Sequence, residues 1–157
     1  MDTNDEYIRW KSDQAIAWLR YVRHEQLTAV ALRDEIDTLR SMTLKGNDTT
    51  ADKVRSTSND AMVDAVQELI DLSEDYRLQL TELKRMKVDA HDRLMRLDDR
   101  RYTVVLTLYY VDGNTWQQVA DKAHYEVETV MRIRTEALPY VYDVMPNEWR
   151  HMIPRAD

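Results

Sequence analysis

The sequence contains no cysteine, only two glycines and only three prolines, and these shortages restrict its structure. Without cysteine the chain has no disulfide, no thiolate nucleophile and no cysteine-ligated zinc site. The first proline is Pro139, so no proline interrupts a helix between residues 1 and 138. Long helices are therefore the default expectation for this chain.

Long apolar runs and catalytic motifs are also missing. No run approaches the roughly 20 residues that span a bilayer, and the first ten residues lack the basic start and apolar core of a signal peptide. No glycine-rich phosphate loop, metal-ligand spacing or nucleophile motif occurs. We expect a soluble cytoplasmic protein that is not an enzyme, binds no metal or cofactor and does not associate with membranes.

The charge balance is acidic, with a formal net charge of −7. Duplex DNA is a polyanion whose binding usually depends on Lys and Arg. Residues 101–157 hold six Lys and Arg against eight Asp and Glu. Any contact with DNA is therefore expected to be local, weak or aided by a partner.

Seven-residue spacing predicts a first amphipathic helix from about Asp5 to Met42. Its apolar or small positions are Ile8, Ala15, Val22, Ala29 and Ile36. Residues 43–60 are rich in Thr, Ser, Asn and Asp, which predicts a loop. Asn59 or Asp60 is then expected to cap the next helix.

A second helix carries the most regular spacing, with apolar residues separated alternately by four and three positions. This pattern predicts a seam about 54 Å long facing a partner helix. A small domain cannot cover such a stripe, so the first helix, another subunit or both must do so. We expect residues 1–97 to form a helical hairpin or coiled coil and the protein to be a homo-oligomer, with a dimer favoured. The seam residues are Met62, Val66, Leu69, Tyr76, Leu80, Leu83, Leu94 and Leu97.

Charged residues 98–101 interrupt this pattern, and an apolar helix and a turn at Gly113 follow. Residues 115–133 then have the spacing of a helix-turn-helix, with Thr115 and Gln118 able to form a capping box. His124 stands where the turn normally contains glycine. Two-helix turns in proteins that do not bind DNA can show the same spacing. The predicted packing positions are Val119, Ala120, Ala123, Tyr125, Val130 and Ile133.

This segment resembles region 4 of the sigma-70 family of transcription factors. The family pattern is Thr-Leu-Glu-Glu-Ile, a turn, and a recognition helix that ends in Ala-Leu. The segment from Thr115 to Leu138 follows this pattern without insertion, and the preceding residues match the helix before the motif. The matching residues are Thr115, Val119, Val130, Ile133, Ala137 and Leu138.

Most of residues 5–138 also resemble small phage regulators of the ArpU and RinA type, in which a helical hairpin precedes the motif. The loop at residues 52–62 and the helix that it leads into contribute to this likeness. The resemblance implies an oligomeric regulator of late or lytic phage genes that binds double-stranded DNA in the host cytoplasm, with host RNA polymerase as a possible further partner.

The candidate DNA-contacting residues depart from the sigma pattern. Val127, Thr129 and Met131 stand where sigma factors have arginines, so recognition of the −35 promoter sequence is not implied. Glu128 can accept from cytosine, Thr129 can touch a thymine methyl group, and Arg132 can reach guanine or phosphate. The full set is Gln117, which we expect at a phosphate, and the helix positions Glu126, Val127, Glu128, Thr129, Met131 and Arg132.

The predicted organisation is all-α: a hairpin at 1–97, a three-helix domain with the motif at 98–138, and an extension at 139–157. Pro139 is expected to end or kink the recognition helix. The extension is apolar enough to pack on the domain or on another subunit. Two other functions stay open. One is an adaptor that binds RNA polymerase without recognising a DNA sequence, and the other is a phage DNA-packaging subunit similar to small terminases.

Overall fold

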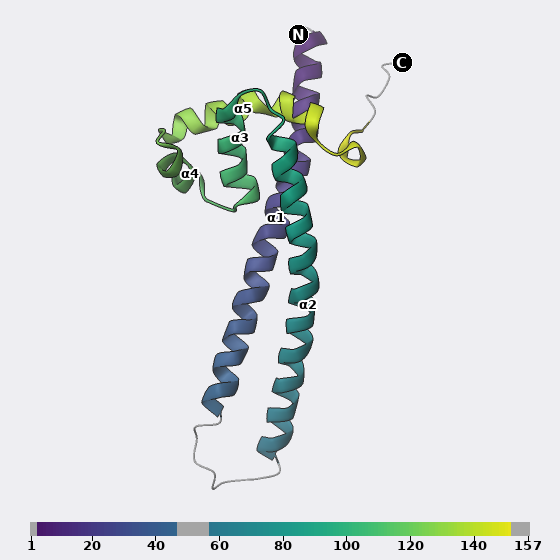
Figure 1. Ribbon diagram of the computed structural model, residues 1–157, viewed down its shortest axis with the longest axis vertical. Coiled ribbons are helices and arrows are strands. Elements are labelled where there is room, and N and C mark those ends of the chain that lie inside the picture. Colours follow the sequence, from purple (N-terminus) through teal and green to yellow (C-terminus); the bar gives the residue numbers. More distant parts are fainter. Residues whose placement is uncertain (1–2, 47–56, 152–157) are drawn as a thin grey trace. The chain divides into compact units, whose positions relative to one another are not determined.

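The computed structural model describes residues 3–46 and 57–151, and every regular element in these ranges is a helix. Two long helices, α1 (Thr3–Gly46) and α2 (Thr57–Leu94), precede several short ones (Figure 1). The prediction of an all-α chain is confirmed. The short elements are α3 (Arg100–Leu106), the π-helix η1 (Thr107–Val111), α4 (Trp116–Ala123), α5 (Val127–Val144) and the 3₁₀ helix η2 (Asn147–Trp149).

Both long helices extend into the segment that was predicted to be a loop. α1 continues to Gly46 and α2 begins at Thr57, so the predicted caps Asn59 and Asp60 lie inside α2. Residues 47–56 lie outside the described residues. The prediction was wrong at both edges because Thr, Ser and Asn only weakly disfavour helix, and no proline stops it there.

The contacts divide the chain into two compact units. Unit 1 comprises Met1–Gln26 and Arg85–Asp157, and unit 2 comprises Leu27–Lys84. The sequence predicts a boundary between residues 97 and 98 instead. The difference arises because the first part of α1 and the end of α2 share one hydrophobic core with the short helices.

Unit 1 has a first core that joins α1, α2, α3, η1 and α5. α1 contributes a face that includes Trp18, Leu19 and Val22, each at most 3% exposed. Each buried aliphatic side chain of this kind stabilises the fold by about 1.5–3 kcal/mol. The other buried members are Ala15, Ala90, Leu94, Leu97, Leu106, Tyr110, Val111, Ala137, Leu138, Val141 and Met145.

α5 does not end at Pro139, so the first of the two outcomes expected from the sequence is wrong, while a kink there stays a prediction. The helix runs from Val127 to Val144 with Pro139 inside it. Val141 and Met145, beyond the proline, are 0% and 1% exposed in the first core. Burial of these side chains offsets the cost of the proline, and it shows that the extension packs on unit 1 as far as it is described.

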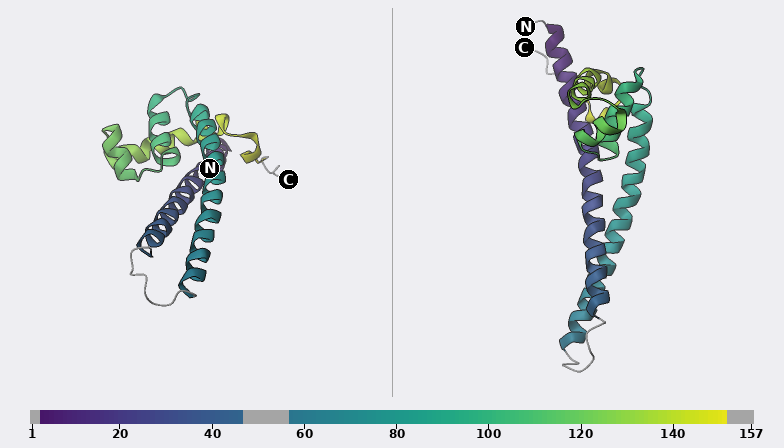
Figure 2. Two further views of the ribbon diagram at one scale, coloured as in Figure 1. Left: turned by 60° about the horizontal axis from the view of Figure 1, so that its bottom comes forward. Right: turned by 90° about the vertical axis from the view of Figure 1, so that its left-hand side faces the viewer.

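Unit 2 contains the end of α1 and most of α2, which lie alongside one another in Figures 1 and 2. Ala29, Ile36 and Leu83 are buried there. Along the predicted seam of α2, Leu69, Tyr76 and Leu80 are half-buried, whereas Met62 and Val66 are 39% and 38% exposed. Leu94 and Leu97 are buried in unit 1. The supercoiling of these helices stays a prediction.

Candidate nucleic-acid interface

The first helix of the predicted motif, α4, begins with a capping box. The Thr115 hydroxyl oxygen accepts from the Gln118 backbone N–H at 3.2 Å, and the Gln118 side-chain oxygen accepts from the Thr115 N–H at 2.9 Å. Two amide groups that a helix start leaves without partners are thereby satisfied. This prediction from the sequence is confirmed.

A left-handed residue then makes the turn. His124 has φ 60° and ψ 43°, and its N–H donates to the Ala120 carbonyl oxygen. The Tyr125 N–H donates to the same carbonyl at 3.0 Å. Histidine can adopt this conformation at some cost, where glycine would adopt it freely. Glu126 precedes α5 in an extended conformation, so the two helices meet across a tight turn.

The two motif helices pack through a second core in unit 1. Val119 and Ala120 from α4 meet Val130 and Ile133 from α5, with Val105 of α3 beneath them. All five are at most 2% exposed. The four residues from α4 and α5 are among the six predicted packing positions, and they hold α4 against α5.

The other two predicted packing positions differ. Ala123 is half-buried, but Tyr125 is 37% exposed and does not belong to either core. The prediction for Tyr125 was wrong because the left-handed turn at His124 changes the chain direction and leaves the next side chain at the surface.

The predicted contact residues divide by exposure. Gln117, Glu126, Glu128 and Arg132 are exposed, whereas Thr129 and Met131 are half-buried.

Val127 is half-buried and packs against the second core, so less of its side chain is open to a DNA groove, and its contact with DNA stays a prediction. It begins α5 beside the turn, where its apolar side chain completes the packing of α4 on α5.

Two of the exposed candidates differ in what they bind within the chain. Gln117 Nε2 donates to Asp121 Oδ1 at 3.0 Å, so a phosphate contact by Gln117 would have to replace that bond beside a carboxylate. The Arg132 side chain makes no hydrogen bond or ion pair with any other described residue. It is therefore the predicted contact residue with a free cationic group.

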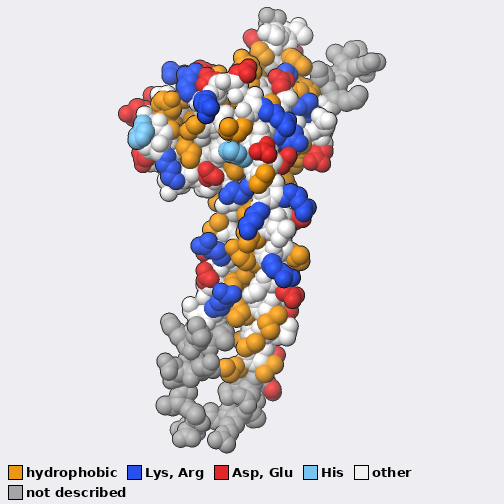
Figure 3. Space-filling model, viewed as in Figure 1, with side chains coloured by type: hydrophobic (Ala, Val, Ile, Leu, Met, Phe, Trp, Pro, Cys, Tyr) orange, Lys and Arg blue, Asp and Glu red, His pale blue; other side chains and the backbone are white. Residues whose placement is uncertain are grey.

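Other basic side chains near the motif are engaged within the fold. Arg134 Nε donates to the Tyr110 hydroxyl at 2.8 Å, and Lys122 Nζ donates to Asn114 Oδ1 at 2.8 Å. Figure 3 shows Lys and Arg interspersed with Asp and Glu over the short helices. The surface of the motif is therefore of mixed charge, and its cations are partly used to hold the fold.

Arg101, at the start of α3, is also engaged within the fold. Arg101 donates to Asp99 Oδ2 at 2.7 Å, while the Asp99 carboxylate also caps the Arg101 N–H. The hydrogen bond from the Arg101 side chain is the main cause that lowers the pKa of Asp99, and the same bond raises the pKa of Arg101. This pair fixes the helix that supports the motif.

Arg23 of α1 is not identified by any sequence pattern, yet it connects α1 to the segment before the motif by hydrogen bonds. Its Nη1 donates to the carbonyl oxygens of Tyr109 at 2.6 Å and Asn114 at 2.9 Å. The guanidinium lies 3.9 Å from the Tyr109 ring centroid, and that ring stacks on Trp116 at 3.5 Å. Arg23 thus holds the π-helix and the residue before the capping box.

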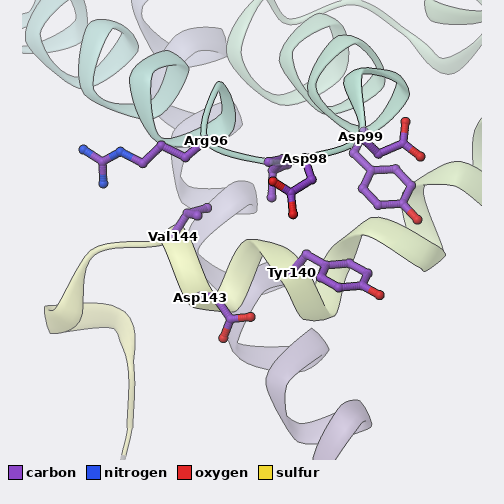
Figure 4. Close-up of a pocket in the computed structure, with 8 residues that line it drawn as sticks. Arg96, Asp98, Asp99, Tyr140, Asp143 and Val144 are labelled. Atoms are coloured by element: carbon purple, nitrogen blue, oxygen red, sulfur yellow. The ribbon is translucent and has the colours of Figure 1, made fainter.

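Unit 1 also contains a pocket of about 340 Å³ between α5 and the segment that joins α2 to α3 (Figure 4). Asp98, Asp99 and Asp143 are among its lining residues. Asp99 binds Arg101, and Asp143 binds Lys11 Nζ at 2.9 Å. Within residues 3–46 and 57–151 no group of three or more His, Asp or Glu could hold a metal ion, and no helix there could cross a membrane.

Comparison with known protein families, curated proteins and solved structures found no match to this chain. The resemblance to sigma region 4 and to the phage regulators therefore depends on the residues named in the sequence analysis.

Proposed function

We propose that this protein is a DNA-binding transcription regulator that contacts the major groove with α5. One observation carries the proposal: the Arg132 side chain is exposed and has no partner among the described residues, and it lies between Val130 and Ile133, which hold this helix against α4. In helix-turn-helix proteins the second helix reads base edges, and arginine pairs with guanine through two hydrogen bonds. Glu128, one turn earlier, is placed to accept from cytosine.

The resemblance to phage regulators narrows this proposal. It supports control of late or lytic phage genes in the cytoplasm of a host cell, by a homo-oligomer that contacts repeated half-sites. Two weak contacts on one DNA gain affinity through their linkage, which an acidic protein needs. A dimer supports regulation, whereas a large ring would support the packaging function instead.

Binding to phage genomic fragments, followed by footprinting, tests the reading of DNA. Arg132→Ala is expected to weaken specific binding by about 1–3 kcal/mol, a factor of roughly 5 to 150. The matched control is Arg9→Ala, which removes the same charge from an exposed position on α1. If both variants keep the footprint and affinity of the original protein, α5 does not read DNA through Arg132.

A second candidate is an adaptor that binds host RNA polymerase without reading sequence. The acidic start of α5, with Glu126 and Glu128 exposed, favours it, because these carboxylates repel phosphate. Fragment binding should be measured with and without host polymerase. Polymerase binding that survives Arg132→Ala, together with no binding to DNA alone, would favour the adaptor.

A further inference from the structure

Unit 1 contains a groove of about 680 Å³ between the end of α2 and α3. Its wall combines exposed cations with exposed apolar side chains. Met95 is 50% exposed and Val104 is 43% exposed, although both are apolar. Arg96 and Arg100 stand beside them at the surface. Such a groove is large enough to admit a few side chains of a partner.

Two of the cations that line this groove, Arg96 and Arg100, are available to a partner. The side chains of Arg96 and Arg100 form no hydrogen bond or ion pair with other residues in the described part of the chain. Lys122, which also lines the groove, is bonded to Asn114, and Asp98 is the only carboxylate among the lining residues. A nucleic-acid backbone would use the cations but would leave Met95 and Val104 exposed. An acidic amphipathic helix would use both.

Unit 2 contains a segment with the properties of an acidic amphipathic helix. Residues 60–75 of α2 hold six Asp and Glu and no Lys or Arg. All six are exposed, and none pairs with a cation among the described residues. Spacings of three and four place five of the six on one helix face, where like charges repel. A cationic partner would relieve this repulsion. The five with that spacing are Asp60, Asp64, Glu68, Asp71 and Asp75.

Exposed apolar residues accompany the acidic face. Val63, Val66 and Ile70 are 65%, 38% and 47% exposed. Their spacing of three and then four residues aligns them along the helix, next to the carboxylates. Apolar anchors with this spacing are how amphipathic helices occupy hydrophobic grooves. We will call residues 60–75 the acidic segment.

We propose that the groove of one molecule binds the acidic segment of a second copy of this chain. Arg96 and Arg100 pair with carboxylates of the segment, while Val63 or Ile70 covers Met95 and Val104. The inference rests on the oligomer in the proposed function and is independent of DNA reading. Each copy supplies one groove and one segment, so two copies that exchange segments form a closed dimer.

Charge reversal on each side, followed by mixing, tests this contact. One variant carries Arg96→Glu and Arg100→Glu, and the other carries Asp64→Lys and Glu68→Lys. Sedimentation equilibrium is expected to show at least a tenfold higher Kd for dimers of either variant alone. An equimolar mixture should recover dimers, because each altered surface then meets a complementary one. Higher salt should weaken the original dimer.

Controls separate this contact from general effects. Arg9→Glu with Arg33→Glu changes the same number of exposed charges elsewhere and should leave the mass unchanged. Val63→Ser with Ile70→Ser should also weaken the dimer, without removing a charge. Circular dichroism should show equal helix content in all variants, since every altered residue is exposed.

The inference is overturned if both charge variants dimerise as the original protein does, or if the mixture stays monomeric. It is also overturned if Arg96→Glu with Arg100→Glu lowers DNA affinity without changing mass, because the groove would then hold phosphate. Footprints of the same samples and of Arg132→Ala report on DNA reading separately. Loss of one property with retention of the other therefore shows which proposal has failed.

Discussion

The Arg23 guanidinium lies 3.9 Å from the ring centroid of Tyr109 and donates to the Tyr109 carbonyl oxygen. Tyr109 belongs to η1, the π-helix that follows α3. The wider turn of a π-helix disturbs the normal pairing of carbonyl groups, and such segments are frequent at functional sites. Here a side chain from α1 supplies the missing donor, so the start of α4 depends on a residue far away in sequence.

Arg23→Met is expected to lower the free energy of unfolding by about 2 kcal/mol. The substitution keeps an apolar stem but removes a charged donor of two hydrogen bonds, and such bonds contribute about 1.5–3 kcal/mol. Urea unfolding followed by circular dichroism measures the change. Arg20→Met, at an exposed position in the same helix, should change stability by less than about 0.5 kcal/mol. Equal effects at both positions would contradict a specific role for Arg23.

The sequence predicts the helices well where spacing alone decides burial. Ala15, Val22, Ala29 and Ile36 recur every seven residues, and each is at most 4% exposed. Ile8 continues that series but is 40% exposed. Spacing identifies the face that a residue shares, but it does not show how far along the helix a partner extends.

The candidate site was predictable only in its local features. The capping box and the turn at His124 depend on neighbouring residues, and the sequence predicts both. Contacts across the fold are different. Arg23 and Tyr109 are 86 residues apart, and no local pattern identifies them as partners. The bond between Lys122 and Asn114 likewise depends on the turn that the folded chain forms.

Ile133→Ala and Tyr125→Ala compare a predicted packing position that is buried with one that is exposed. Ile133 is 2% exposed in the second core, and its truncation should cost about 2–5 kcal/mol of unfolding free energy. Tyr125 is 37% exposed, so its truncation should cost much less. Thermal and urea unfolding of both variants measure this difference. A larger loss for Tyr125→Ala would mean that its ring packs against a core.

Pro139→Ala is expected to raise the free energy of unfolding by about 1–3 kcal/mol. Proline inside a helix lacks the N–H that would donate one turn back, and it costs about 3 kcal/mol relative to alanine. Part of that gain is lost, because the half-buried proline ring also packs and alanine is smaller. Urea unfolding measures the gain, with Ala137→Gly on the same helix as a variant expected to destabilise. A less stable Pro139→Ala protein would show that the proline ring is needed for packing.

Stability should fall as the pH rises above about 10, with Tyr110 as one cause. Burial is the main reason that the pKa of Tyr110 is raised from 10.0, while the hydrogen bond from Arg134 opposes it. Above pH 10 the unfolded chain therefore loses this proton before the folded protein does, and the unfolded state gains stability. Below that pH both states keep the proton, so Tyr110 adds no pH dependence.

Tyr110→Phe isolates this contribution. The variant should be less stable at neutral pH, because Arg134 loses an acceptor, yet its stability should decline less steeply between about pH 9 and pH 11. The pKa of Tyr102 is also raised, mainly by burial. Tyr102 is present in both proteins, so it contributes equally to both slopes. Urea unfolding across this range gives the two slopes. Parallel slopes would show that the Tyr110 phenol ionises as easily in the folded protein as in the unfolded chain.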